Sequence, residues 1–235
     1  MRIAQLPLAP GDRRARLGQQ AQEASSLRPE EITWAAQPVV GTGLREAVMA
    51  VARSSEVSSL HARAAAAGAP GARFMGAGFA LWRAFTHNYP EQGAPAVLVA
   101  VEPEGLHLIF VAGSRWQVRA LRWSAAGDDE LALAELELKR ALALHRHQAE
   151  LREPEVLFWA AHRRVEDAAL SQLAEALALR VERFDPFRRV GRSASAVLDD
   201  DVTAQAKLVG LALLRRARDV DAFDMCPAWV KRVEQ

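Results

Sequence analysis

Apolar runs and amphipathic segments alternate through the first half of the chain, and this pattern predicts strands interleaved with helices. The run AVMAVA at 47–52 has the composition of a buried strand. It passes directly into Ser54, Ser55 and Glu56, which are residue types that begin helices. Gly68 stands where that helix is expected to end. The other elements predicted in this half are strands at 2–8, 32–39 and 73–76 and helices at 12–25 and 79–85.

Residues 87–95 gather Pro, Gly and Asn, and they predict a linker between two lobes. Three apolar runs follow, separated by turn-forming residues around Gly105 and Gly113, and they predict an antiparallel meander. The predicted elements of this half are strands at 96–101, 106–111, 117–123, 155–160 and 181–184, helices at 127–151, 166–179 and 204–218, and a polar loop at 192–201. The fold class is therefore α/β, with a first lobe at 1–86 and a second at 96–235, each built on a mixed sheet flanked by helices.

Half of the 235 residues are apolar, which is enough to bury a core. The 30 basic and 29 acidic residues nearly cancel, whereas proteins that bind nucleic acid usually carry a basic excess. The single cysteine, Cys226, excludes an internal disulfide and suits a reducing compartment. The sequence contains neither a signal-peptide core at its start nor a run approaching the roughly 20 apolar residues of a membrane span. We therefore expect a cytoplasmic protein that binds no nucleic acid and does not insert into a membrane.

A few segments of the sequence contain these elements in a characteristic order. In the first lobe they are RIAQLPLAP and EAVMAVARSSEVSSLHARAAAAGA, and the meander is AVLVAVEPEGLHLIFVAGSRWQVRALRW. The closing segments are ELELKRALALHRHQAE, EVLFWAAHRRVEDAALSQLAEALALRVERFDPFRRV and AKLVGLALLRR. Together they resemble the PilM family of type IV pilus assembly proteins. The resemblance implies a reduced, two-lobed actin-like fold of the ribonuclease-H-like kind, related to the cytoplasmic domains of type II secretion linker proteins.

The resemblance also implies where a nucleotide site would lie. In the family, a second-lobe strand ends in Asp, a hydrophobic residue and Gly, with Ser or Thr shortly after. The matching positions here are Ala100, Val101 and Glu102, with Leu106 at the hydroxyl position. The acid that would place a metal ion is missing, and Glu102 adds negative charge where a phosphate would bind. Pro103 removes a backbone N–H donor.

Two further parts of that site depart from the family. In the family, a run of glycines lies on the adenosine side of the nucleotide, and the matching positions here are Trp159, Ala160 and Ala161. An indole therefore stands where the backbone of the family approaches the base. The first phosphate-binding turn would lie on a hairpin before Met1, and the family's helical subdomain is reduced to 124–130. These departures predict a non-catalytic scaffold that has no cofactor and no metal. The alternative is an ATP-binding actin-like protein with a variant site, in which Glu102 and Glu104 replace the acid; a solvated hairpin end is the interpretation we favour for these two residues.

By the same resemblance, the chain is expected to bind the short cytoplasmic segment of a membrane-anchored pilus or secretion assembly protein, at the inner membrane. The groove would lie in the first lobe, around the helix that begins near residue 12 and the strand at 47–52. If the first hairpin is missing, the sheet of this lobe has an edge that needs covering, by residues 2–8, a partner or another subunit. Formation of a homo-oligomer is therefore left open.

Other reactive residues favour plain structural roles. His145 and His147 are two apart on a predicted helix, about 200° around its axis, so one helix cannot offer both to one metal ion. Cys226 has no nearby base that would activate it as a nucleophile. The local basic concentration is either a solvated face or a docking patch for an acidic partner segment. It comprises Arg163, Arg164, Arg183, Arg188, Arg189 and Arg192.

Overall fold

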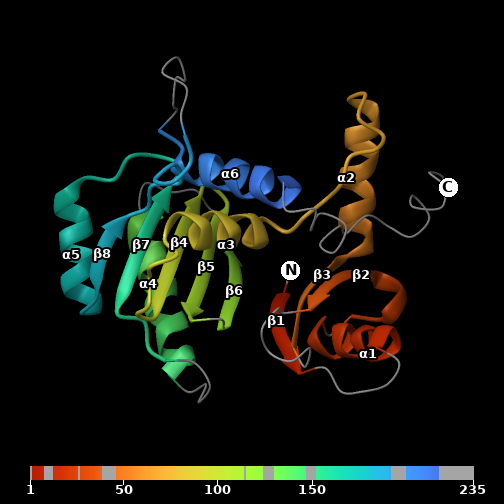
Figure 1. Ribbon diagram of the computed structural model, residues 1–235, viewed down its shortest axis with the longest axis horizontal. Coiled ribbons are helices and arrows are strands. Elements are labelled where there is room, and N and C mark those ends of the chain that lie inside the picture. Colours follow the sequence, from red (N-terminus) through yellow and green to blue (C-terminus); the bar gives the residue numbers. More distant parts are fainter. Residues whose placement is uncertain are drawn as a thin grey trace. The chain divides into compact units, whose positions relative to one another are not determined.

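The computed structural model describes residues 2–7, 13–25, 27–38, 46–113, 115–123, 130–146, 152–191 and 200–216. Residues 1–76 belong to one compact unit, and residues 77–214 form the other (Figure 1). The sequence predicted lobes at 1–86 and 96–235, so the division falls earlier in the chain than the predicted linker. The reason is that α3 (Ala77–Asn88) and the turn after it pack against other parts of residues 77–214.

The first unit is built on an antiparallel sheet with the strand order β2-β3-β1. The middle strand, β3, places Ala50 opposite Ile3 of β1 on one side and opposite Ala35 of β2 on the other. The predicted strand at the start of the chain therefore forms and pairs with the AVMAVA strand. The elements are β1 (Arg2–Pro7), α1 (Arg13–Ser25), η1 (Pro29–Glu31), β2 (Ile32–Pro38), β3 (Glu46–Arg53) and α2 (Ser54–Ala66).

A small core joins α1 to this sheet. Ala21 of α1 is buried together with Met49 and Val51 of β3, and the partly buried Ile32 and Trp34 of β2 pack against them. Alternation along β3 gives this result, because residues two apart on a strand share a face. α1 thus covers the face of the sheet that carries Met49 and Val51.

The second unit is built on a mixed sheet with the strand order β6-β5-β4-β7-β8. The meander strands β4, β5 and β6 are antiparallel, whereas β4, β7 and β8 are parallel neighbours. β4 is therefore the strand at which the pairing changes from antiparallel to parallel. Besides α3, the elements are β4 (Ala96–Glu102), β5 (Gly105–Ala112), β6 (Arg115–Arg122), α4 (Glu130–Arg146), β7 (Val156–Ala161), α5 (Asp167–Leu177), β8 (Arg180–Arg183) and α6 (Val202–Arg216).

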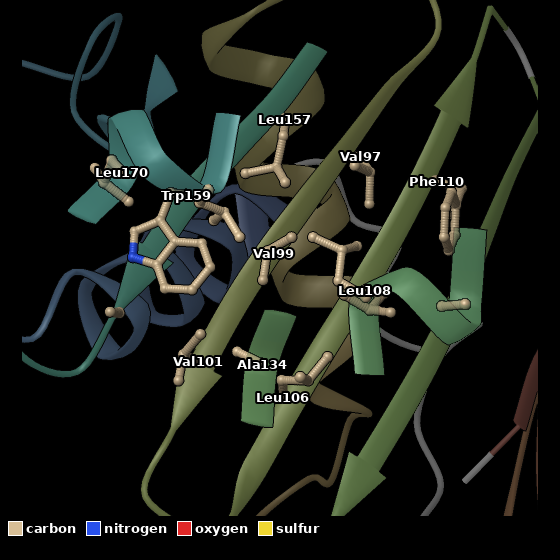
Figure 2. Packing of buried hydrophobic residues seen from close by; sticks show 14 residues of the cluster. Val97, Val99, Val101, Leu106, Leu108, Phe110, Ala134, Leu157, Trp159 and Leu170 are labelled. Carbon is tan, nitrogen blue, oxygen red and sulfur yellow. The ribbon is translucent and has the colours of Figure 1, made fainter. Parts of the chain in front are cut away.

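One face of this sheet carries the main core of the unit (Figure 2). Alternate residues of β4, β5 and β7 point to this face, as Val97, Val99 and Val101 do on β4. α4 covers them with Ala134, Leu138 and Ala141, which lie on successive turns of the helix. α5 adds Leu170 and Leu173. The apolar strands that the sequence predicted are buried because helices pack on both of their faces.

The opposite face is covered by α3 and holds an aromatic cluster. Phe85 of α3 meets Phe158 of β7 edge-on, with ring centroids 5.0 Å apart. Tyr89, just after α3, lies 4.7 Å from Phe158 and 5.5 Å from Phe184, again between centroids. Phe158 therefore points to the face that α3 covers. Its neighbour Trp159 points to the opposite face, which carries the main core.

Asn88 ties the end of α3 to the segment after β8. Its side chain is fully buried and its amide nitrogen donates to the carbonyls of Ala84 and Pro186, each at 2.8 Å. Its amide oxygen accepts from the Arg189 backbone N–H at 2.8 Å. These bonds, together with the bond from the Asp185 N–H to the Tyr89 hydroxyl at 2.9 Å, explain why the predicted linker is part of the second unit.

α6 and α3 approach each other so closely that only glycine is tolerated at the crossing. A Cβ added at Gly210 of α6 would lie 1.8 Å from the carbonyl oxygen of Ala80 in α3. Ala80 itself is 1 % exposed, so the two backbones are in direct contact within the core. The sequence alone does not indicate this contact, because Ala80 and Gly210 lie far apart along the chain.

The predicted order of elements is confirmed apart from one strand. Residues 73–76 are irregular and lead into α3, which begins at Ala77 and is longer than the predicted 79–85. The run between Gly71 and Gly76 is too short to form a stable row of hydrogen bonds with a neighbouring strand, and helix-forming residues follow it directly. α4 is described from Glu130, so the predicted start of that helix at 127 falls outside the described residues.

Candidate functional site

Two of the sequence segments matched to a nucleotide site come together at the carboxyl ends of neighbouring strands. β4 and β7 pair in parallel, with Val101 opposite Ala161. On its other side, Val101 lies opposite Leu106 of β5. The sequence-predicted positions gathered here are Ala100, Val101, Glu102, Leu106, Trp159, Ala160 and Ala161.

Six of these seven positions are buried in the core. Ala100 is fully buried and Leu106 is 1 % exposed, while Trp159 is 4 % exposed and lies in the main core (Figure 2). Except for Glu102, their side chains are apolar or, for Trp159, an indole. Apolar side chains packed at a strand end can neither ligate a metal ion nor orient water. The only carboxylate at these positions is therefore that of Glu102.

Glu102 is engaged by a lysine and a histidine of the second unit. Its Oε1 accepts a hydrogen bond from Nζ of Lys207 in α6 at 3.0 Å, and Nε2 of His107 in β5 lies 3.4 Å from the same oxygen. The carboxylate is 25 % exposed, so solvent reaches it only in part. We refer to Glu102, His107 and Lys207 as the Glu102 cluster.

The backbone at this strand end also has its partners within the protein. The Val101 carbonyl accepts from the His162 N–H at 3.1 Å and from the Thr203 hydroxyl at 3.2 Å. Thr203 and Lys207 are four residues apart on α6 and so share a helix face. One face of α6 thus contacts both Val101 and Glu102 at the end of β4.

A second charged group lies at the same end of the sheet. The Glu130 side chain, at the start of α4, is 9 % exposed, and its Oε2 lies 3.2 Å from Nε of Arg163. Nε2 of His162 is 3.5 Å from the same oxygen. A carboxylate at a helix N-terminus is favoured by the helix dipole. Sequence reasoning missed Glu130, because the residues that pair with it follow a strand far along the chain.

The β4–β5 hairpin turn is closed tightly by backbone contacts. Gly105 has φ of +154°, and a Cβ there would lie 2.0 Å from the Leu121 carbonyl oxygen on β6. The indole Nε1 of Trp123 donates to the Pro103 carbonyl at 2.9 Å, and the Trp123 N–H donates to the Glu104 carbonyl at 3.2 Å. Gly105 therefore serves strand packing at this turn. Glu104 is exposed, which agrees with a solvated hairpin end for that residue.

A cavity of about 400 Å³ opens beyond the end of β7. Its volume is at the lower end of the range for small-molecule sites. The lining combines apolar side chains, among them Trp159, Val165 and Phe187, with charged ones of both signs. The charged residues of the lining are Arg163, Arg164, Arg183, Asp167, Asp185 and Asp200.

Most of the basic concentration seen in the sequence is ion-paired in the structure. Arg183 pairs with Asp167 at 2.6 Å, and the guanidinium holds the pKa of that carboxyl below its usual value. Arg188 and Arg189 both pair with Glu91, and Arg188 also lies over the Tyr89 ring at 4.6 Å. These contacts favour the solvated face over a docking patch. Arg192 lies outside the described residues.

The remaining candidates have structural surroundings. His145 is buried on α4, stacked on Phe110 with centroids 4.4 Å apart, and its Nε2 is 3.1 Å from the Arg152 carbonyl. His147 and Cys226 lie outside the described residues. Within the described part of the chain, groups of three or more His, Cys, Asp or Glu side chains that could hold a metal ion are absent. Its helices also include none that is long and apolar enough to cross a bilayer.

The residues at these positions do not fit a magnesium nucleotide. Such a ligand needs free backbone N–H groups and a carboxylate available to the metal. Here the strand ends carry buried apolar side chains, and Pro103, which follows β4, has no backbone N–H to donate. The Glu102 carboxylate is held by Lys207.

His107 should make the stability of the second unit depend on pH. Burial lowers the pKa of His107, with Glu102 opposing the shift and Lys207 and Arg122 adding to it. The unfolded chain therefore takes up a proton near pH 6.5 that the folded chain takes up only at lower pH. Stability is fully kept above about pH 7 and is expected to fall as the pH drops from about 6.5 toward the folded pKa. Urea unfolding of the wild type and of His107→Gln should show equal pH dependence above pH 7 and a shallower fall for the variant below it. An identical fall in both would contradict this account.

Neither a protein-family model nor a curated protein matches the chain. A chain of a PilM–PilN type IV pilus biogenesis complex matches in structure with a TM-score of 0.69 and 18% identity, over 90% of this chain and 75% of that chain. A Bacteroides thetaiotaomicron protein of unknown function with an actin-like ATPase fold matches with a TM-score of 0.52 and 11% identity, over 88% and 69%. The cytoplasmic domain of EpsL, an inner-membrane component of the Vibrio cholerae type II secretion system, matches with a TM-score of 0.50 and 8% identity, over 90% and 69%. At these identities the likeness concerns the fold, and the chain has the actin-like α/β fold that its sequence predicted.

Proposed function

We propose that this chain is a non-catalytic cytoplasmic adaptor in the assembly of a type IV pilus or a related secretion system, where it binds the cytoplasmic segment of an inner-membrane partner. Two observations together support the proposal. The fold is shared over most of the chain with a pilus biogenesis complex, and the strand ends that would form a nucleotide site are filled by core side chains. Because one fold can host unrelated functions, this fold can serve as a protein-binding adaptor.

The absence of nucleotide binding is the first part to test. Isothermal calorimetry with Mg-ATP at millimolar concentration is expected to give no saturable heat, because Ala100 offers no metal ligand and Glu102 places negative charge beside the strand end. ATP is also expected to leave the melting temperature unchanged, since a ligand stabilises only a state that it binds. A dissociation constant in the micromolar range would overturn the adaptor reading.

The cavity beyond β7 is the observation that favours a second candidate, an ATP-binding protein with a variant site. It is large enough for a small ligand and offers Arg164 and other polar groups beside the Trp159 indole. The same titration separates the two functions. If ATP binds, replacing Arg164 by Gln should weaken the binding, because this arginine lines the cavity.

Partner binding is the second part to test. Following the family resemblance of the sequence, we propose that the binding surface lies in the first unit, near α1 (Arg13–Ser25) and β3 (Glu46–Arg53). Gln19 is an exposed residue of α1, so a photo-crosslinking amino acid placed there would report a partner without disturbing the core. In cells that make the pilus or secretion proteins, we expect light to couple this variant to a small membrane-anchored protein.

A matched control uses the same crosslinker at Glu175, an exposed residue of α5 in the second unit. It should give no such product if the partner binds the first unit. A membrane-protein adduct from position 175 alone would move the surface to the second unit, and adducts from neither position under assembly conditions would contradict the proposed role.

A further inference from the structure

We propose that the Glu102 carboxylate acts as an internal anion that replaces a bound ligand, fastening α6 to the end of the β4–β5 hairpin through Lys207 and His107. The inference rests on the proposed function, in which the second unit works without nucleotide. It concerns a different quantity, however, namely the mutual stabilisation of three named side chains.

Lys207 Nζ and His107 Nε2 approach the same oxygen of Glu102, at 3.0 and 3.4 Å. They come from different elements, α6 and β5, so the carboxylate is the point at which β4, β5 and α6 meet. A carboxylate that accepts from an ammonium and lies beside an imidazole on another element links these elements as a bound anion would.

The surroundings of this oxygen are partly shielded from solvent. The Glu102, Lys207 and His107 side chains are 25 %, 30 % and 15 % exposed, so water screens their attraction only in part. One turn before Lys207, Thr203 is 1 % exposed and donates to the Val101 carbonyl. That bond fixes the position of α6, so the Lys207 ammonium stays close to the strand end without the carboxylate.

Removal of the Glu102 carboxylate would leave its two neighbours without this partner. Lys207 and His107 would then face a space with no counter-charge, and Nδ1 of His107 is a buried nitrogen without a hydrogen-bond partner among the described residues. A space between an ammonium and an imidazole suits a small oxyanion such as inorganic phosphate. The site is thus closed in the wild type by a side chain and is opened by shortening that side chain.

A double-mutant cycle tests the fastening. Glu102→Gln, Lys207→Gln and the double variant are compared with the wild type by thermal unfolding at low salt. We expect each single variant to melt about 2–4 °C lower and the double variant to melt no lower than either single variant, because the partners act as a unit. Glu135→Gln and Lys139→Gln form the matched control, since these residues make a Glu–Lys pair within α4 at 2.6 Å. This exposed pair, four residues apart, should change the melting temperature by less than 1 °C or so.

Phosphate tests the replacement of a ligand. Glu102→Ala is expected to melt about 2–4 °C higher in 50 mM phosphate than in chloride of equal ionic strength. The wild type, Glu135→Ala and the Glu102→Ala/Lys207→Ala double variant should show no such difference. If Glu102→Ala does not fold, Glu102→Ser is used in the same way, since it also removes the carboxylate.

The outcomes separate this inference from the proposed function. Additive losses in the cycle, or a phosphate response no larger than that of Glu135→Ala, overturn the internal-anion role even if the wild type fails to bind ATP. Saturable Mg-ATP binding by the wild type instead overturns the proposed function, and the inference with it. The inference is supported if the losses in the cycle are non-additive and if phosphate raises the melting temperature only of the variant with a shortened Glu102 side chain.

Discussion

Gly210→Ala is expected to lose about 3 kcal/mol of its free energy of unfolding, near the upper end of what overpacking costs. The added Cβ would stand 1.8 Å from the Ala80 carbonyl oxygen and 2.5 Å from its carbon, and these are backbone atoms that no rotamer change can move. α6 would have to move away from α3, and buried neighbours such as Val209 and Leu214 would move with it. Urea unfolding followed by circular dichroism measures this loss directly.

A second helical glycine provides the matched control. At Gly18 in α1 an added Cβ would meet only the Trp34 ring, at 3.7 Å, which is ordinary contact. Gly18→Ala is therefore expected to gain about 0.5–1 kcal/mol from helix propensity. If Gly210→Ala behaved like Gly18→Ala, the close crossing of α3 and α6 would be refuted.

Trp159→Ala is expected to cost about 3–5 kcal/mol, as large-to-small changes of buried aromatic residues do. Trp159 is 4 % exposed and packs in the main core, with Leu170 and Val99 in the same cluster (Figure 2). Its indole Nε1 is buried without a hydrogen-bond partner among the described residues. Most of its contribution should therefore come from packing.

Trp159→Phe separates packing from hydrogen bonding. Because no bond to Nε1 is lost, phenylalanine should keep most of the stability and cost about 1 kcal/mol, while alanine leaves a cavity. Chemical denaturation of both variants gives the two values. Equal losses for Phe and Ala would show that the indole nitrogen, through a partner such as water, contributes more than the ring.

Local pattern was sufficient to predict most elements of this fold. β4 and β7 are continuous apolar runs of strand length, and the turn at Gly105 separates the first two strands of the meander, so both features can be read within a few residues. The predicted strand at 73–76 failed because four residues contain too little pattern to distinguish a strand from an irregular lead into a helix. The predicted linker failed because Asn88 and Tyr89 obtain their partners about 100 residues later in the chain.

The candidate site shows the same limit. The sequence predicted that Ala100, Leu106 and Trp159 could not form a nucleotide site, which follows from residue type alone. It did not indicate that Lys207 would meet Glu102, because the two are 105 positions apart and only the packing of α6 brings them together. Nor did the sequence indicate that His107 would lie beside the Glu102 carboxylate. Its place beside Glu102 follows from its register opposite Ala100, which requires the sheet to be known.

The position of β4 has a consequence for synthesis on the ribosome. Its antiparallel partner β5 follows it immediately, but its parallel partner β7 begins roughly 60 residues later, as the pairing of Ala96 with Val156 shows. At about 5–20 residues per second, a nascent chain therefore waits about 3–12 s with one side of an apolar strand unpaired. Such an edge invites pairing with another chain, so a factor that holds the emerging meander, or a slow codon placed after β7, would change the yield of folded protein more than it changes its stability.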